Sequence, residues 1–199
     1  LYATHSSDRA INFTKQELMP HFFSPTYKEL FPHIKTKYDL TDNDKKSKES
    51  RKTATLSDNA FSLVGKRGRY LAVGVGQSIS GYPASLIVVD DYFGSAADSR
   101  SEVIKNKVNQ WWKSDIEARA QSNTLKILFC TRWVSDDIIG LIRREALENE
   151  DDNYQLPEII TLPAQLELHH EKHSYDPREV GDYLWNIYKF KYASAKKDE

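Results

Sequence analysis

The feature that most constrains the fold of this chain is an apolar run that ends in two adjacent aspartates, Leu-Ile-Val-Val-Asp-Asp at residues 86–91. A short apolar run between turn-forming residues is typical of a strand buried on both faces of a parallel sheet. Here Gly81 precedes the run and Gly94 follows it. Open α/β sheets bind ligands at the carboxyl ends of their strands. The run therefore predicts a central strand with Asp90 and Asp91 in a ligand-binding position; the alternative is a strand that ends in a solvated turn.

Length and composition fit one globular domain of ordinary size with room for a small appendage. The chain has 199 residues, of which 39% are hydrophobic and 29% charged. A net charge of −1 excludes an overall basic footprint for nucleic acid, so any DNA contact must be local. Cys130 is the single cysteine, which excludes an internal disulfide and fits a reducing compartment. No apolar run reaches membrane-spanning length.

Helical and strand-like patterns alternate along the chain, which indicates a largely parallel sheet. A first predicted strand ends near residue 4, and further strands are predicted at residues 60–64, 69–75, 125–130 and 158–162. Helices are predicted at residues 7–20, 25–31, 98–120 and 135–148. Because the chain starts with what looks like the end of a strand, we expect a missing segment upstream of Leu1. The polar segment 41–53 is expected to be a mobile, locally basic loop, which either contacts DNA phosphates or is only solvated.

Polar residues also follow the predicted strand at residues 125–130. Thr131 and Arg132 come directly after it. If this strand neighbours the Asp90 strand, all four polar residues lie at the same end of the sheet. Thr131 could then sense a phosphate or the attacking water, and Arg132 could contact phosphate or DNA. In the alternative, Thr131 caps the strand end and Arg132 forms an ion pair with Asp136 or Asp137.

One expected part of a nucleotide site is absent from the sequence. There is no G-x-x-x-x-G-K-[ST] motif, the backbone cradle that holds a triphosphate. A chain that begins after this loop would lack it through truncation.

The order of several short segments resembles the ATPase domain of phage large terminase subunits, the motors that package DNA. The segments are residues 1–6 (LYATHS), 23–32 (FSPTYKELFP), 72–81 (AVGVGQSISG), 86–91 (LIVVDD), 130–140 (CTRWVSDDIIG), 162–164 (LPA), 176–178 (DPR) and 184–185 (LW). The resemblance implies a P-loop NTPase-like (ASCE) α/β domain with a mainly parallel sheet flanked by helices. It assigns residues 1–165 to a partial ATPase domain and residues 166–199 to an extension toward a nuclease domain outside this chain.

The resemblance also implies site roles. Asp90 matches the acid that helps hold Mg²⁺, and Asp91 matches the carboxylate that activates water. Thr131 and Arg132 match the motif that couples hydrolysis to subdomain movement. One departure is Tyr82, which stands where the family usually has Arg, so any phosphate or neighbour-subunit contact of that Arg is in doubt.

From the resemblance we expect ATP and Mg²⁺ as cofactors, and double-stranded DNA, the portal protein, the small terminase subunit and further copies in a ring as partners. The complete protein would act in the host cytoplasm, transiently at the procapsid portal and without a membrane. This chain alone would be inactive, since it lacks the P-loop. Two alternatives remain, namely a degenerate interaction module without a P-loop and a helicase-like nucleic-acid ATPase.

Two further groups of residues have a functional and a structural interpretation. His169, His170 and His173 have a spacing that can hold zinc, but histidines in a polar loop are the favoured interpretation. Trp111 and Trp112 could stack bases, but their helical spacing favours core packing for at least one of them. Cys130 is expected to serve as a small buried apolar residue rather than a nucleophile.

Overall fold

The computed structural model describes residues 1–36, 39–40, 56–79, 81, 83–149, 157–163, 165–170, 174 and 176–184. The chain forms two compact units, Leu1–Arg144 and Glu145–Glu199, whereas the predicted boundary is at 165/166. The predicted loop at 41–53, Tyr82 and His173 lie outside the described residues.

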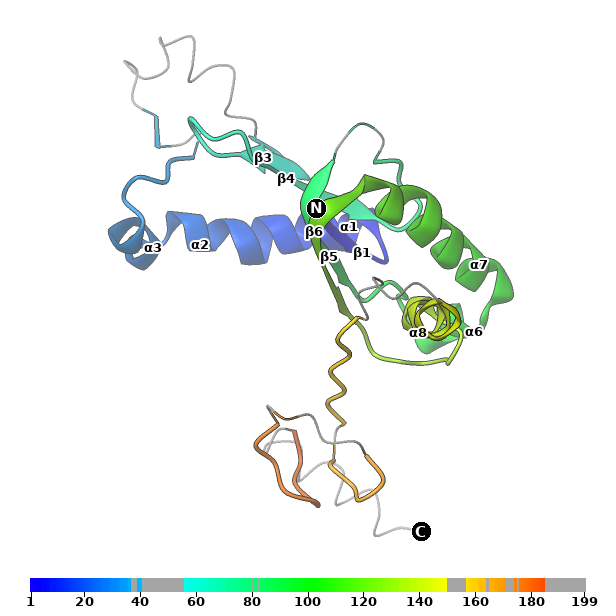
Figure 1. The fold of residues 1–199 in the computed structure, drawn as a ribbon. Coiled ribbons are helices and arrows are strands. Elements are labelled where there is room, and N and C mark those ends of the chain that lie inside the picture. The colour runs from blue at the N-terminus through cyan, green and yellow to red at the C-terminus, as the bar shows by residue number, and fades with distance from the viewer. Residues whose placement is uncertain are drawn as a thin grey trace. The chain divides into compact units, whose positions relative to one another are not determined.

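Six strands form one mixed sheet in the order β2-β3-β4-β1-β5-β6. Figure 1 shows the strands together with the helices around them. The strands are β1 (Tyr2–Thr4), β2 (Leu56–Ser57), β3 (Ala60–Ser62), β4 (Arg69–Gly74), β5 (Ala84–Asp90) and β6 (Ala120–Phe129). Strands β4, β1, β5 and β6 are parallel neighbours, and β2 and β3 add an antiparallel ribbon next to β4. The predicted α/β architecture with a mainly parallel sheet is therefore confirmed.

Helices precede and follow the strands of this sheet. They are α1 (Ser7–Asn12), the π-helix η1 (Phe13–Leu18), α2 (Met19–Phe23), α3 (Pro25–Leu30), α6 (Ala96–Arg100), α7 (Glu102–Trp111), the π-helix η3 (Trp112–Ile116), the 3₁₀-helix η4 (Glu117–Arg119) and α8 (Ile138–Glu148). Serine side chains cap several of them, as the sequence suggests. Ser6 Oγ accepts from the N–H of Arg9 at 3.2 Å, which satisfies one of the free donors at the start of α1.

Three sequence predictions are wrong in detail. The helix predicted at 98–120 breaks at Ser101, which caps α7. Val103, in the first turn of α7, is exposed, although one continuous helix would turn it inward. The helix predicted at 135–148 begins only at Ile138, because Asp137 caps α8 through its Oδ1, which accepts from the N–H of Gly140 at 2.9 Å. Residues 158–162 pair with no strand in the described part of the chain; without a partner, an apolar pattern cannot satisfy a strand's backbone groups.

The two faces of the sheet are packed by different helices. On one face, α7 and η3 cover Ala3, Val73, Ile87 and Val89 of the central strands. Trp111 and Trp112 belong to this core and are both buried, which confirms core packing. On the other face, α1 places Ala10 against Tyr2 and Ala72. Because successive strand residues point to opposite faces, the same short strands supply both cores.

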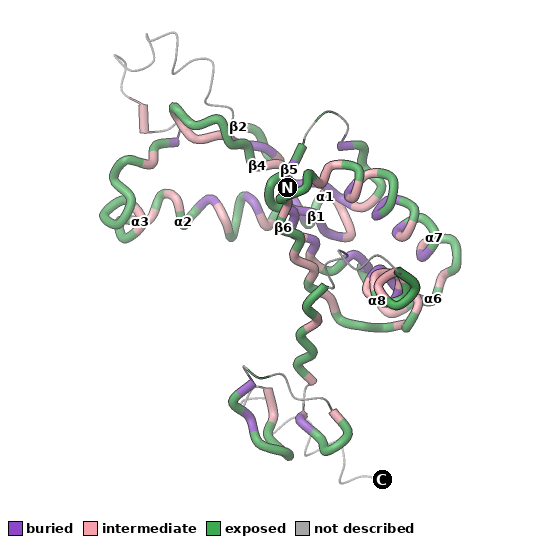
Figure 2. Tube along the Cα trace, in the orientation of Figure 1, coloured by how far each residue is buried: buried purple, intermediate pink, exposed green. Residues whose placement is uncertain are grey.

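Strand β6 departs from the prediction of a buried strand at 125–130. It spans Ala120–Phe129, and none of its ten residues is fully buried, whereas all three residues of β1 are (Figure 2). β5 is also only partly buried, since Leu86 is half-exposed. The reason is that β6 has a strand neighbour on one side only among the described residues. Cys130, just after β6, is half-buried and packs against the α7 core.

The second unit has a small local framework of its own. Leu166 is buried, and the Arg178 guanidinium forms hydrogen bonds of 2.9 and 2.7 Å to the two carboxylate oxygens of Asp176. Arg178 also donates to the carbonyl of Pro163 at 2.7 Å. Among the described residues, no helix is both long and apolar enough to cross a membrane.

The approach of β4 to α1 requires glycine at the end of β4. A Cβ on Gly74 would lie 2.3 Å from the backbone nitrogen of Ser7, far inside van der Waals contact. We expect Gly74→Ala to lower the free energy of unfolding by about 1–3 kcal/mol, because α1 must shift to make room. Gly68→Ala is the matched control, since a Cβ there meets nothing within 4 Å. Equal urea midpoints for the two variants would contradict this packing.

Candidate functional site at the carboxyl ends of β1, β5 and β6

Polar residues from three neighbouring parallel strands meet at one end of the sheet. Thr4 at the end of β1 is in register with Asp90 at the end of β5, and Asp90 is in register with Phe129 at the end of β6. Thr131 and Arg132 follow β6 directly. The structure therefore brings together the four residues that the sequence singled out, at the end of the sheet where α/β proteins bind ligands.

Asp91 has an unusual backbone that ties the three strand ends together. Its φ of 45° lies in the left-handed region, where Asp and Asn are the best tolerated residues after Gly. Its N–H donates to the carbonyl of Phe129, and its carbonyl accepts from the N–H of His5, each at 3.0 Å. Its Oδ1 accepts from the N–H of Thr131 at 3.4 Å. The exposed carboxylate is thus held at the centre of the site, in a conformation that is often found at functional sites.

Asp90 points to the α1 face of the sheet. Its Oδ2 accepts a hydrogen bond of 2.9 Å from the hydroxyl of Tyr2, whose side chain is buried and stacked on Phe13. Burial, and then the neighbouring Asp90 carboxylate, raise the pKa of Tyr2 well above its usual range, so Tyr2 stays a donor at neutral pH. Asp90 and Asp91 therefore present their carboxylates in different directions from one strand end.

Arg132 forms an ion pair with Asp137, as the structural alternative for this residue predicts. Its Nε donates to the buried Oδ2 of Asp137 at 2.7 Å, and its Nη2 donates to the carbonyls of Val134 and Ser135. About a third of the side chain stays exposed. The guanidinium therefore fixes the turn between β6 and α8 and still has a solvent-facing side. No side-chain hydrogen bond of Thr131 is found among the described residues.

A second ion pair attaches the same turn to α7. Nζ of Lys105 lies 2.5 Å from Oδ2 of Asp136 and 2.8 Å from Oε1 of Glu102. The hydrogen bonds to Asp136 and Glu102 raise the pKa of Lys105, and the hydrogen bond from Lys105 lowers the pKa of Asp136. The turn that carries Thr131 and Arg132 is thus held from both sides, by Asp137 beneath it and by Lys105 beside it.

This ion pair predicts a specific pH dependence. Since the folded state lowers the pKa of Asp136, its stabilising effect is complete above the unfolded pKa of about 3.9 and is lost as pH falls through the folded value. We expect Asp136→Asn to lower the urea midpoint at pH 7 but not at pH 2.5. The matched control is Asp115→Asn, which removes a carboxylate that accepts from Ser114. A midpoint difference for Asp136→Asn that is constant from pH 7 to pH 2.5 would contradict the assignment.

Sequence reasoning missed two residues of this site as functional candidates. His5 contacts Asp91 through its backbone, and its ring lies beside Gly94, where an added Cβ would be 3.1 Å from the ring. Tyr2 holds Asp90. Both belong to β1 or follow it, 85 or more residues from the aspartates, so only the pairing of β1 with β5 could have shown their proximity.

An apolar strip of the sheet beside Asp90 is uncovered. In register, Leu86 pairs with Leu125, Val88 with Ile127 and Asp90 with Phe129, all on the α1 face. Leu86, Leu125 and Phe129 are 44%, 59% and 58% exposed. We call these five apolar residues, Leu86, Val88, Leu125, Ile127 and Phe129, the open strip. Val88 packs against the core beneath α1, whereas Leu86, Leu125 and Phe129 are covered by no helix of the described part of the chain. An exposed apolar patch of this kind is uncommon on a sheet face.

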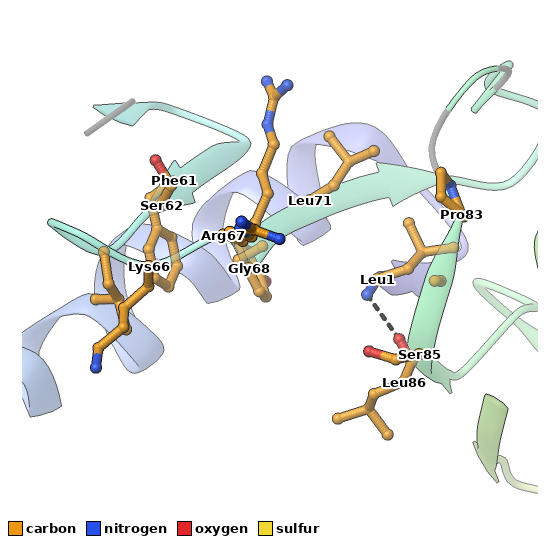
Figure 3. A pocket seen from close by; sticks show the side chains of 14 residues that line it. Leu1, Phe61, Ser62, Lys66, Arg67, Gly68, Leu71, Pro83, Ser85 and Leu86 are labelled. Atoms are coloured by element: carbon orange, nitrogen blue, oxygen red, sulfur yellow. Dashed lines mark hydrogen bonds between the residues drawn. The ribbon is translucent and has the colours of Figure 1, made fainter. Parts of the chain in front are cut away.

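A cleft of about 560 Å³ lies near the starts of β4 and β5, at the other end of these strands (Figure 3). It is lined by basic and apolar side chains, including Lys66, Arg67 and Leu86. Leu1 also lines it and donates from its nitrogen to the carbonyl of Leu86 at 2.8 Å. The cleft contains none of the four predicted site residues.

Within the described ranges, a metal ion could be held by at most two neighbouring His, Cys, Asp or Glu side chains. No group of three or more His, Cys, Asp or Glu side chains comes close enough to hold a metal ion within the described ranges. The ring centroids of His169 and His170 lie 4.2 Å apart with the rings tilted by 46°, while His173 lies outside the described residues. Mg²⁺ typically takes only one or two carboxylates and completes its shell with water and substrate phosphates. Asp90 and Asp91 fit that chemistry.

The chain matches no protein-family model, and no curated protein matches it.

Proposed function

We propose that this chain is part of the ATPase domain of a viral DNA-packaging motor, a terminase large subunit, that couples Mg-ATP hydrolysis to translocation of double-stranded DNA into a procapsid. The observation that carries the proposal is the position of Asp90 and Asp91. They end a central parallel strand, next to the residues that follow β6 and next to an uncovered part of the sheet. The order of the resembling segments supports the same conclusion.

The open strip supports the proposal that a strand, a phosphate-binding loop and a helix precede β1 in the complete protein. Crossovers between parallel strands are right-handed. The crossover through α1 leads from β1 to β4, and the crossover through α7 leads from β5 to β6 in the opposite direction, so they use opposite faces. A helix that leads into β1 from a strand beyond β6 must cross the α1 face. That is the face on which the open strip and Asp90 lie.

In this proposal each of the site residues has its own role in ATP hydrolysis. Asp91 accepts a proton from the attacking water, and its left-handed backbone keeps the carboxylate exposed at the strand end. Asp90 would hold Mg²⁺, which when bound neutralises charge on the phosphates. Thr131, hydrogen-bonded through its N–H to Asp91, transmits the state of the site to the turn that Arg132 fixes. Catalysis by such a site consists mostly of positioning and charge stabilisation.

Asp91→Asn tests the proposed base directly. Asn keeps the side-chain shape and tolerates the left-handed backbone, so the fold should be preserved. We expect ATP hydrolysis by the complete protein to fall by about 10²–10⁴-fold with ATP affinity unchanged, since proton transfer is lost but binding is not. Asp58→Asn, in the exposed turn between β2 and β3, is the matched control and should hydrolyse ATP normally. Near-normal hydrolysis by Asp91→Asn would remove Asp91 from this role.

ATP affinity measured by calorimetry tests the proposed contribution of the upstream segment. We expect no ATP binding to the 199-residue chain, because two carboxylates cannot hold a triphosphate without a cradle of backbone N–H groups. The complete protein should bind ATP, and more tightly with Mg²⁺. Tight binding by the chain alone would contradict the proposal. An absence of binding in the complete protein would favour the interaction module.

The open strip also keeps the interaction module as a second candidate, because an uncovered apolar face can receive a partner protein. A helicase-like ATPase would share the carboxylate pair but not a packaging partner. Binding of the complete protein to portal protein and to the small terminase subunit separates the packaging motor from both alternatives.

A further inference from the structure

The buried tyrosine beneath Asp90, Tyr2, packs in the core and also reaches the Asp90 carboxylate with its hydroxyl. Tyr2 is 6% exposed, and its ring stacks on Phe13 with centroids 4.4 Å apart and an interplanar angle of 20°. This stacking, and the pairing of β1 with β5, place the ring against the strand that carries Asp90. The hydroxyl ends 2.9 Å from Oδ2 of Asp90.

We propose that Tyr2 is a positioning residue for the metal site, which holds one oxygen of Asp90 so that the other faces the divalent cation. This inference rests on the proposed function of Asp90. Oδ1 of Asp90 accepts no hydrogen bond from any described residue and so keeps its lone pairs for a cation or its water. Groups that hold a metal-ligating carboxylate from behind fix its orientation and affect metal affinity strongly.

A comparison with Tyr70 separates this role from the ordinary need of a buried hydroxyl for a hydrogen-bond partner. Tyr70 packs against the same α1-side core, and its hydroxyl lies 3.0 Å from Oγ1 of Thr14 on η1. Its partner is a neutral hydroxyl in a helix. The partner of Tyr2 is a carboxylate at the ligand-binding end of β5. Both hydroxyls are satisfied, but only that of Tyr2 acts on a group of the site.

The test measures metal affinity without turnover. Mn²⁺, as a spectroscopic substitute for Mg²⁺, is titrated by electron paramagnetic resonance into the complete protein with a non-hydrolysable ATP analogue. Tyr2→Phe keeps the ring and removes the hydroxyl, and it should weaken Mn²⁺ binding by about 10-fold or more. The matched control Tyr70→Phe should leave the affinity unchanged. In an Asp90→Asn background, Tyr2→Phe should have no further effect.

Each outcome decides the inference. An unchanged Mn²⁺ affinity for Tyr2→Phe, or an effect that persists in the Asp90→Asn background, overturns the role of Tyr2 and leaves the proposed function intact. Wild-type protein that takes up no Mn²⁺ overturns the proposed function and this inference with it.

A measurement on the unaltered sequence covers the case in which Tyr2→Phe does not fold. With ¹³C-labelled tyrosine, Mg²⁺ and the same ATP analogue should shift the ring resonance of Tyr2 and leave that of Tyr70 in place. A Tyr2 resonance that does not respond to saturating Mg²⁺ overturns the inference.

Discussion

The parallel pairing of β5 with both β1 and β6 is the constraint on which the site depends. This pairing sets Thr4, Asp90 and Phe129 in one row, and the contacts that Asp90 and Asp91 make depend on that row. It also lets the backbone of Asp91 bond to both neighbouring strands. A one-residue slip of β5 would turn Asp90 to the α7 face and break its hydrogen bond with Tyr2. The sheet register is thus a condition for the chemistry.

The sequence predicted most of the sheet and the neighbourhood of the aspartates, because both depend on local patterns. The apolar runs before Asp90 and Thr131 identified two strands, and their polar ends implied a shared site. The contacts of Tyr2 and His5 with the two aspartates could not be predicted, because they depend on which strands are neighbours. The sequence predicts a buried β6, but none of its residues is buried. An apolar pattern shows that a strand face is suited to burial, but it does not show whether another element of this chain covers that face.

The turn after β6 is held by an arginine side chain that is still partly open to solvent. Arg132 forms an ion pair with the buried Asp137 and three hydrogen bonds in total within this turn, while about a third of its side chain stays exposed. Lys105 holds the same turn through Asp136. Asp137 and Lys105 thus attach the turn to the start of α8 and to α7. Under the proposed function, this turn would be the link between Asp91 and the following helix α8.

The left-handed backbone at residue 91 also explains the length of the acid found there. A glutamate would carry the same charge further from the strand, but longer side chains are poorly tolerated at a φ of 45°. Aspartate is the carboxylate that this conformation accepts most easily. The carboxylate therefore stays one methylene nearer to the main chain than that of a glutamate. Under the proposed function, any water that it activates would have to lie close to the strand ends themselves, which sets how deeply a nucleotide would have to enter the site.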